Sequence, residues 1–148
     1  MAHEVILESV PLRRTVVVRA KTTWSEFPRM WPVLSSEVWN CLRAGGIGSG
    51  SPNVMLYRES GGVLDVEVGV LLDRELPTTG RVSVSSLPEG RVAHAVHRGP
   101  YAQLGSVHRA IAEWSASNGY VPSGTRWEIY GPHNDDPAQL TTELYGLL

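Results

Sequence analysis

The order of predicted structural elements occurs twice along this chain, and this repetition constrains its fold more than any other feature. Short runs of β-branched or apolar residues predict strands, and apolar residues spaced three or four apart predict one helix in each half. The order in each half is strand, strand, helix, strand, strand. The predicted strands cover residues 5–7, 15–20, 53–59, 63–72, 80–85, 91–97, 125–130 and 141–148, and the predicted helices cover residues 25–43 and 101–118.

The two halves also match at individual residues in corresponding elements. Placing residues 1–76 over residues 77–148 pairs Trp39 with Trp114, Tyr57 with Tyr130, and Gly69 with Gly146. We therefore expect an α+β fold in one domain over residues 1–148, built from duplicated β-β-α-β-β halves. Its antiparallel sheet would have about eight strands, with two helices on one face related by a pseudo-two-fold axis. A groove between the halves is the natural place for a ligand.

The composition argues against several classes of function. Thirteen basic and fifteen acidic residues leave a net charge of −2, with no run of basic residues, which argues against nucleic acid as the main partner. No stretch approaches the ~20 apolar residues of a membrane span, and the N-terminus lacks the pattern of a secretory signal. We expect a globular cytoplasmic protein that binds neither nucleic acid nor membrane.

Residue types that serve catalysis or metal binding are sparse. The single cysteine, Cys41, lies on the apolar stripe of the first helix, which predicts a buried and unreactive thiol. The glycine-rich segment 45–50 lacks the lysine of a phosphate-binding loop. His94 and His97 are three apart on a predicted strand and so point to opposite faces, and His133 lies in a polar loop that we expect to be solvated. We expect neither a metal nor a cofactor.

The aromatic residues favour a ligand-binding surface. The chain has five tryptophans and five tyrosines but one phenylalanine. Tryptophan and tyrosine combine a flat ring with a polar group, which suits the stacking of aromatic or cationic organic molecules. Trp31 and Trp114 lie on helical apolar stripes, where we expect core packing. Tyr57, Tyr130 and Tyr145 lie on strands near the predicted groove.

Glu128 is the acidic residue with the most informative surroundings. It lies in the segment Trp127-Glu128-Ile129-Tyr130, where strand alternation places it on the same face as Tyr130. If that face lines the groove, the carboxylate could neutralise a cation, and burial should raise its pKa and suit it as a general base. If that face is exposed, Glu128 is an ordinary surface acid.

Several segments of the chain together resemble the GyrI-like family of small-molecule-binding domains. The resemblance is strongest over residues 80–148 and weaker over the whole chain. It rests on the order and spacing of His97-Arg98-Gly99-Pro100-Tyr101, Trp114, Asn118-Gly119-Tyr120, Trp127-Glu128-Ile129-Tyr130 and Thr141-Thr142-Glu143-Leu144-Tyr145.

The resemblance implies the duplicated fold inferred above and a pocket for small molecules. By position, Glu128 resembles the glutamate of the family's pocket, and Tyr101 resembles the tyrosine after the strand–helix junction. The counterpart of Glu128 in the first half is Met55, so one wall of the pocket would be acidic. Trp39, as the counterpart of Trp114, would wall the groove. Members serve as effector-binding domains of transcription regulators, as stand-alone proteins related to DNA gyrase inhibitor, or as hydrolases of cyclopropane-bearing DNA-alkylating natural products.

Three functions follow as hypotheses. The first is stand-alone binding of hydrophobic, aromatic or cationic small molecules, since 148 residues leave no room for a helix-turn-helix. The second is a cofactor-independent hydrolase in which Glu128 activates water and the hydroxyl of Tyr101 or Tyr130 stabilises the oxyanion. The third is a protein-interaction module of the gyrase-inhibitor type. The expected ligand-binding residues are Trp39, Tyr57, Tyr101, Glu128, Tyr130 and Tyr145.

Overall fold

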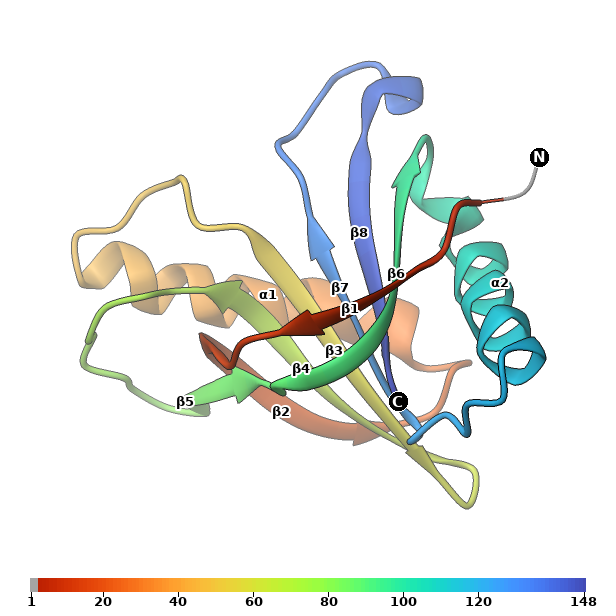
Figure 1. Ribbon diagram of the computed structural model, residues 1–148. Coiled ribbons are helices and arrows are strands. Elements are labelled where there is room, and N and C mark those ends of the chain that lie inside the picture. Colours follow the sequence, from red (N-terminus) through yellow and green to blue (C-terminus); the bar gives the residue numbers. More distant parts are fainter. Residues whose placement is uncertain (1–2) are drawn as a thin grey trace.

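The computed structural model describes residues 3–148, which form one open sheet of eight strands and two α-helices (Figure 1). Single 3-10 turns at Tyr101–Gln103 and Pro137–Gln139 precede α2 and β8. The elements are β1 (Ile6–Val10), β2 (Arg13–Thr22), α1 (Phe27–Ala44), β3 (Asn53–Ser60), β4 (Val63–Leu71), β5 (Val82–Leu87), β6 (Gly90–Arg98), α2 (Leu104–Ser117), β7 (Thr125–Tyr130) and β8 (Thr141–Leu147).

The strand order confirms the pseudo-two-fold arrangement expected from the repetition. The order across the sheet is β1-β6-β8-β7-β3-β4-β2-β5, and every neighbouring pair is antiparallel. The counterparts are β1 and β5, β2 and β6, β3 and β7, and β4 and β8. When each strand is replaced by its counterpart, the result is the same order read from the opposite edge of the sheet. The axis therefore passes between β3 and β7, where Met55 lies directly opposite Glu128.

Two pairs of consecutive strands do not pair with each other. The sequence predicted strands over residues 5–7 and 15–20. Both strands exist, but β1 pairs with β6 of the other half, and β2 pairs with β4 and β5. The consecutive strands β5 and β6 separate in the same way. Pro11 lacks an N–H for a ladder, so the chain can leave β1 there and cross to the other half. Each half thus lends its first strand to the other.

The β3–β4 connection is a hairpin, as the Ser60-Gly61-Gly62 sequence predicts. Ser60 pairs with Val63, so the loop has two residues. Both glycines have positive φ, 58° and 82°, which matches the twist of the flanking strands.

Both helices pack on the same face of the sheet. The apolar stripe of α1 covers β2 and β4, and that of α2 covers β6 and β8. Tyr57 belongs to the α1 cluster yet its ring lies 6.2 Å from that of His108 on α2, and Tyr130 packs against both clusters. Pro28 lies in the first turn of α1, where its N–H would have no intrahelical acceptor, whereas Pro32 lies inside the helix and removes one i→i−4 hydrogen bond near its start.

The opposite face of the sheet buries a second apolar cluster. Val10 and Leu87, from the ends of the edge strands β1 and β5, pack against it, so the twisted sheet covers part of its own second face (Figure 1). Gly69 on β4 allows the backbone of the neighbouring strand β2 to approach closely, because a Cβ at this position would lie 1.9 Å from the carbonyl oxygen of Val16. Across residues 3–148, no helix is long and apolar enough to cross a membrane.

Candidate functional site

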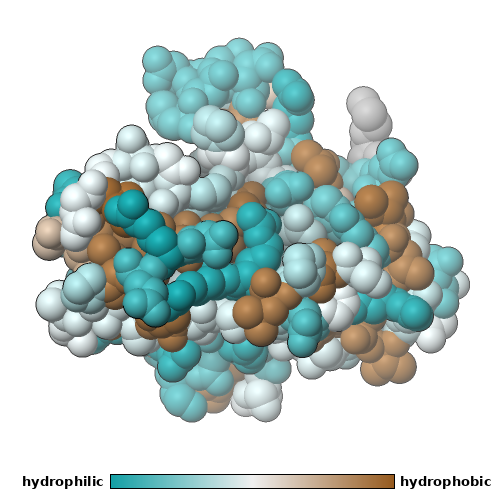
Figure 2. Space-filling model, turned by 60° about the vertical axis from the view of Figure 1, so that its left-hand side comes forward, coloured by the Kyte–Doolittle hydropathy of each residue, from teal (hydrophilic) through white to brown (hydrophobic). Residues whose placement is uncertain are grey.

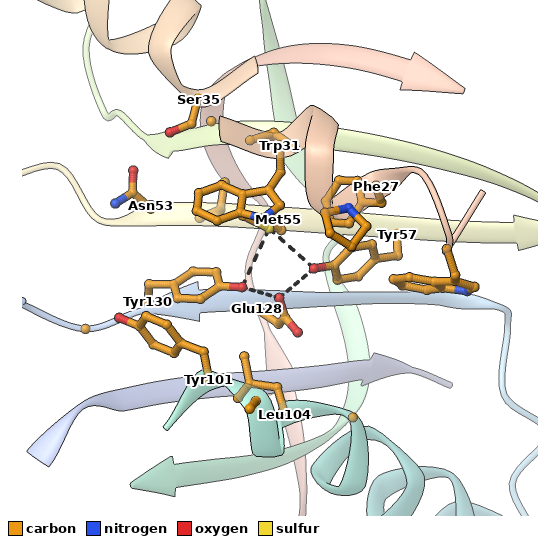
Figure 3. A pocket seen from close by; sticks show the side chains of 18 of the residues that line it. Phe27, Trp31, Ser35, Asn53, Met55, Tyr57, Tyr101, Leu104, Glu128 and Tyr130 are labelled. Carbon is orange, nitrogen blue, oxygen red and sulfur yellow. Dashed lines mark hydrogen bonds between the residues drawn. The ribbon is translucent and has the colours of Figure 1, made fainter. Parts of the chain in front are cut away.

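A cavity of about 690 Å³ opens between the two helices, over the centre of the sheet (Figure 3). Strands β3 and β7 form its floor. The β2–α1 connection and the first two turns of α1 form one wall, and the start of α2 forms the other. Its aromatic lining consists of Trp24, Phe27, Trp31, Tyr57, Tyr101 and Tyr130. The pseudo-two-fold axis predicted this location, since the cavity lies where the halves meet.

The floor of the cavity is symmetric in its aromatic residues and asymmetric in charge. Tyr57 on β3 and Tyr130 on β7 flank the directly opposed pair Met55 and Glu128. Both tyrosine hydroxyls lie near the Met55 sulfur, at 3.4 Å and 3.6 Å. Among the described residues that line the cavity, Glu128 is the only one with a carboxylate.

Three donors hold the buried Glu128 carboxylate. The residue is 4% exposed. Its Oε1 accepts hydrogen bonds from the hydroxyls of Tyr57, at 2.7 Å, and Tyr130, at 2.5 Å (Figure 3). Its Oε2 lies 2.8 Å from Nε2 of His108 on α2. The carboxylate is therefore fixed by both sheet strands at the axis and by the second helix.

These contacts reverse the pKa shift that burial alone would cause. Desolvation of Glu128 raises its pKa, but the hydrogen bond and charge of His108 and the two tyrosine hydroxyls together lower it below the ordinary value. The sequence-based expectation of a raised pKa was therefore wrong. That expectation was based on the apolar neighbours of Glu128 in the sequence. It did not include the donors that the fold brings from other elements, which are Tyr57 on β3 and His108 on α2. The site holds a stable anion.

The two tyrosines keep their protons at this site. Burial raises the pKa of Tyr57 and of Tyr130, and the negative charge of Glu128 raises both further. Each hydroxyl is thus a neutral donor committed to the carboxylate.

A second, smaller cavity of about 400 Å³ adjoins the first and is also lined by Glu128. It shares Trp24, Tyr57 and Glu128 with the larger cavity and is also lined by His108 and two arginines, Arg109 and Arg126. The Arg126 guanidinium lies 5.2 Å from the ring centre of Trp24 and 2.9 Å from Oε1 of Glu59. Glu128 therefore borders both cavities.

The structure brings together four of the six expected ligand-binding residues. Tyr57, Tyr101, Glu128 and Tyr130 all line the larger cavity. The ring of Tyr101 stands at an angle of 82° to that of Tyr130, with centres 5.3 Å apart, and is 43% exposed at the cavity wall.

Trp39 and Tyr145 lie outside this cavity. Trp39 borders a neighbouring cavity, and its Nε1 donates to Oδ1 of Asn53 at 2.9 Å. Tyr145 points to the opposite face of the sheet, where it stacks on His94 with ring centres 4.3 Å apart. On β8 it is Leu144 that packs under α2, so alternation turns Tyr145 away.

Sequence reasoning missed four residues at or next to the site. Trp31 was expected in the core, but it is 41% exposed and lines the cavity, as do Trp24 and Phe27. His108 was not among the residues to which the sequence analysis gave a role. A signal was available, because His108 lies four residues after the buried Leu104 and therefore on the inward side of α2.

The remaining candidate groups do not form a site. Cys41 is buried, as expected. His94 contacts Glu8 on the face away from the helices, whereas His97 contacts His3 and the Pro100 carbonyl. Within the part of the chain that the structure describes, no three His, Cys, Asp or Glu side chains cluster so that they could hold a metal. The polar 131–139 loop projects from the top of the molecule as a hydrophilic group (Figure 2), in agreement with a solvated loop.

Several solved structures share this fold. The C-terminal domain of EcmrR has a TM-score of 0.77 at 20% identity, covering 99% of this chain and 98% of that domain. SAV2435 bound to tetraphenylphosphonium has a TM-score of 0.68 at 16% identity, covering 97% of this chain and 92% of that protein. A hydrolase from Listeria innocua has a TM-score of 0.63 at 14% identity, covering 98% of this chain and 91% of that protein.

These identities establish the fold alone. The chain spans 57% of the EcmrR chain seen in a DNA complex, so it corresponds to part of that protein. No curated protein matches the sequence. The model of the GyrI-like small molecule binding domain matches residues 3–146, which is nearly the whole chain and confirms the resemblance found in the sequence. The chain therefore belongs to the GyrI-like family of small-molecule-binding domains.

Proposed function

We propose that this chain binds lipophilic organic cations in the cavity between its helices, with Glu128 as the anionic anchor. The observation that carries the proposal is a buried carboxylate that is held by three hydrogen bonds in a cavity lined by six aromatic side chains. The cavity volume of about 690 Å³ lies within the range of roughly 300–1,000 Å³ typical of small-molecule sites.

The charge of the anchor favours cations over neutral ligands. Glu128 keeps its charge without a ligand, because His108, Tyr57 and Tyr130 stabilise it. A delocalised cation is attracted to this carboxylate and also to the faces of the aromatic rings. Each cation–π contact contributes about 0.5–2 kcal/mol. The binding of tetraphenylphosphonium by SAV2435, which has the same fold, supports this ligand class.

Calorimetric titration with tetraphenylphosphonium tests the proposal. We expect saturable one-to-one binding, weakened about tenfold or more by Glu128→Gln, since removing a buried charge partner costs a few kcal/mol. Glu143→Gln is the matched control, because Glu143 lies on the neighbouring strand, on the opposite face and partly exposed. Triphenylphosphine oxide, which is neutral, should lose little affinity in Glu128→Gln. Absence of binding, or equal binding by Glu128→Gln and the wild type, would contradict the proposal.

Hydrolysis of a strained electrophile is the second candidate. Its supporting observation is the Tyr101 ring on the cavity wall beside Tyr130, which could present its hydroxyl to a substrate carbonyl. Against it, Glu128 has a lowered pKa and donors on both oxygens, which weaken it as a base for water. Incubation with a cyclopropane-bearing alkylator, followed by mass spectrometry for the addition of water, tests this candidate. Product formation that Glu128→Gln abolishes would support it.

A further inference from the structure

We propose that His108 determines the ligand charge that the cavity accepts: bound organic cations expel the proton of His108, so cation binding is coupled to proton release. The inference rests on the proposed function, since it concerns the same anchor. It assigns His108 as a specificity-determining residue that competes with the ligand for the charge of Glu128.

The geometry places His108 and the ligand on the same carboxylate. Nε2 of His108 lies 2.8 Å from Oε2 of Glu128, and the two side chains are 10% and 5% exposed. The tyrosines occupy the other oxygen, Oε1. A neutral imidazole can still donate its Nε2–H to this carboxylate, so the contact persists in both protonation states while its charge changes.

The two cavities separate the ligand from the path of the proton. Glu128 lines both cavities, whereas His108 lines the smaller one. A ligand can therefore fill the larger cavity and approach the carboxylate there. The imidazole can exchange its proton with solvent through the smaller cavity, which it lines.

Charge balance gives the direction of the coupling. With His108 protonated, the pair is neutral, and an added cation leaves a buried excess of one positive charge. With His108 neutral, the pair carries one negative charge, and the same cation balances it. Buried uncompensated charge is costly, so the cation selects neutral His108, and the protonated form favours neutral aromatic ligands.

Other charged groups near the pair do not supply this titration. Tyr57 and Tyr130 have raised pKa values and keep their protons near neutral pH. The charge of His108 and the two hydroxyls lower the pKa of Glu128 below its ordinary value of 4.5, and a bound cation replaces the charge of His108, so Glu128 stays ionised in both states. Arg109 and Arg126 stay protonated.

Three further histidines need to be considered. On the strands under α2, His97 faces the helix but is engaged by His3 and the Pro100 carbonyl. The exposed His133 lines the larger cavity and contacts Asp135, so it is unsuitable as a control. His94 lies on the opposite face of the sheet, where it also contacts a glutamate, Glu8, and it is the matched control.

Calorimetry with tetraphenylphosphonium, whose charge does not titrate, tests the coupling. Titrations in two buffers of different ionisation enthalpy count the protons released per ligand, from about pH 5.5 to 8.5, a range that brackets the ordinary histidine pKa. We expect up to one proton released and an affinity that rises by up to about tenfold per pH unit before levelling off. Triphenylphosphine oxide should bind without proton release.

Two variants assign the proton to His108. His108→Gln keeps an N–H donor without a titratable group, so it should abolish the release and bind the cation more tightly than the wild type at the acidic end. His94→Gln should behave like the wild type. Nuclear magnetic resonance of the His108 ring at constant pH should record loss of its proton when the cation binds, a change that a structural role would not produce.

The outcomes separate the two proposals. If the wild type binds the cation with no proton release at any pH, or if His108→Gln releases protons as the wild type does, this inference is wrong and the proposed function stands. If no cation binds at any pH, both are wrong.

Discussion

Glu128 is a charged residue at a position where burial alone would neutralise it. Three donors from three different elements, β3, β7 and α2, keep it ionised. Charge-assisted hydrogen bonds of this kind are stronger than neutral ones, and removing the charge leaves the donors without a comparable acceptor. The anchor thus contributes to folding as well as to the proposed binding.

This contribution predicts a pH-dependent cost for Glu128→Gln. Because folding lowers the pKa of Glu128, its stabilisation is present above the ordinary value of 4.5 and is lost as the pH falls through the folded value. At pH 7 we expect the variant to lose about 1–3 kcal/mol of unfolding free energy. Urea unfolding across pH should find this loss shrinking below about pH 4.5. A loss that is constant with pH, or equalled by Glu143→Gln, would contradict the role of the charge.

At the scale of elements, the first half of α1 forms the cavity wall and the second half packs elsewhere. Trp31 and Trp39 are both on this helix, but their eight-residue separation places Trp39 about 12 Å further along the axis. Trp31 therefore lines the larger cavity, and Trp39 borders the neighbouring cavity, where it bonds to Asn53. The helical stripe predicted an inward face without distinguishing core from cavity.

Trp31→Ala and Trp39→Ala should therefore differ in ligand binding. We expect Trp31→Ala to weaken tetraphenylphosphonium binding by about 0.5–2 kcal/mol, the usual worth of one aromatic face against a cation. Trp39→Ala should leave the affinity within about twofold of the wild type, because the residue does not line this cavity. Calorimetry at fixed pH measures both, with thermal unfolding as the check on folding. The reverse ranking would place the ligand in the neighbouring cavity.

For the whole molecule, the exchange of edge strands makes the two halves depend on each other. The pairs β1–β6, β2–β5 and β3–β7 all join one half to the other. The floor of the cavity and the hydrogen bond between Tyr57 and Glu128 lie on the β3–β7 pair. Neither half contains a complete sheet or a complete site.

We therefore expect fragments 1–76 and 77–148 to be unfolded when separate, because each would expose unpaired strand edges and half of a core. Mixed in equal amounts, they should recover the circular dichroism of the intact chain and bind tetraphenylphosphonium. Size-exclusion chromatography should find a one-to-one complex. A fragment that folds alone with cooperative thermal unfolding would contradict this interdependence.

The sequence by itself determined the elements, their repetition and the faces of most strands. Periodicity depends on nearby residues, so it predicted the helices, the eight strands and the shared face of Glu128 and Tyr130. Family resemblance and strand alternation identified four residues that line the cavity: Tyr57, Tyr101, Glu128 and Tyr130.

Tertiary structure decided which half each first strand joins, which face of β8 is covered, and the charge of Glu128. Tyr145 turns away because Leu144 packs under α2, a choice that alternation along β8 leaves open. The direction of the Glu128 pKa shift depends on His108 and Tyr57, which lie 20 and 71 residues away in sequence. A local pattern records which residues share a face, whereas the electrostatics of a buried group depend on which distant donors the fold places against it.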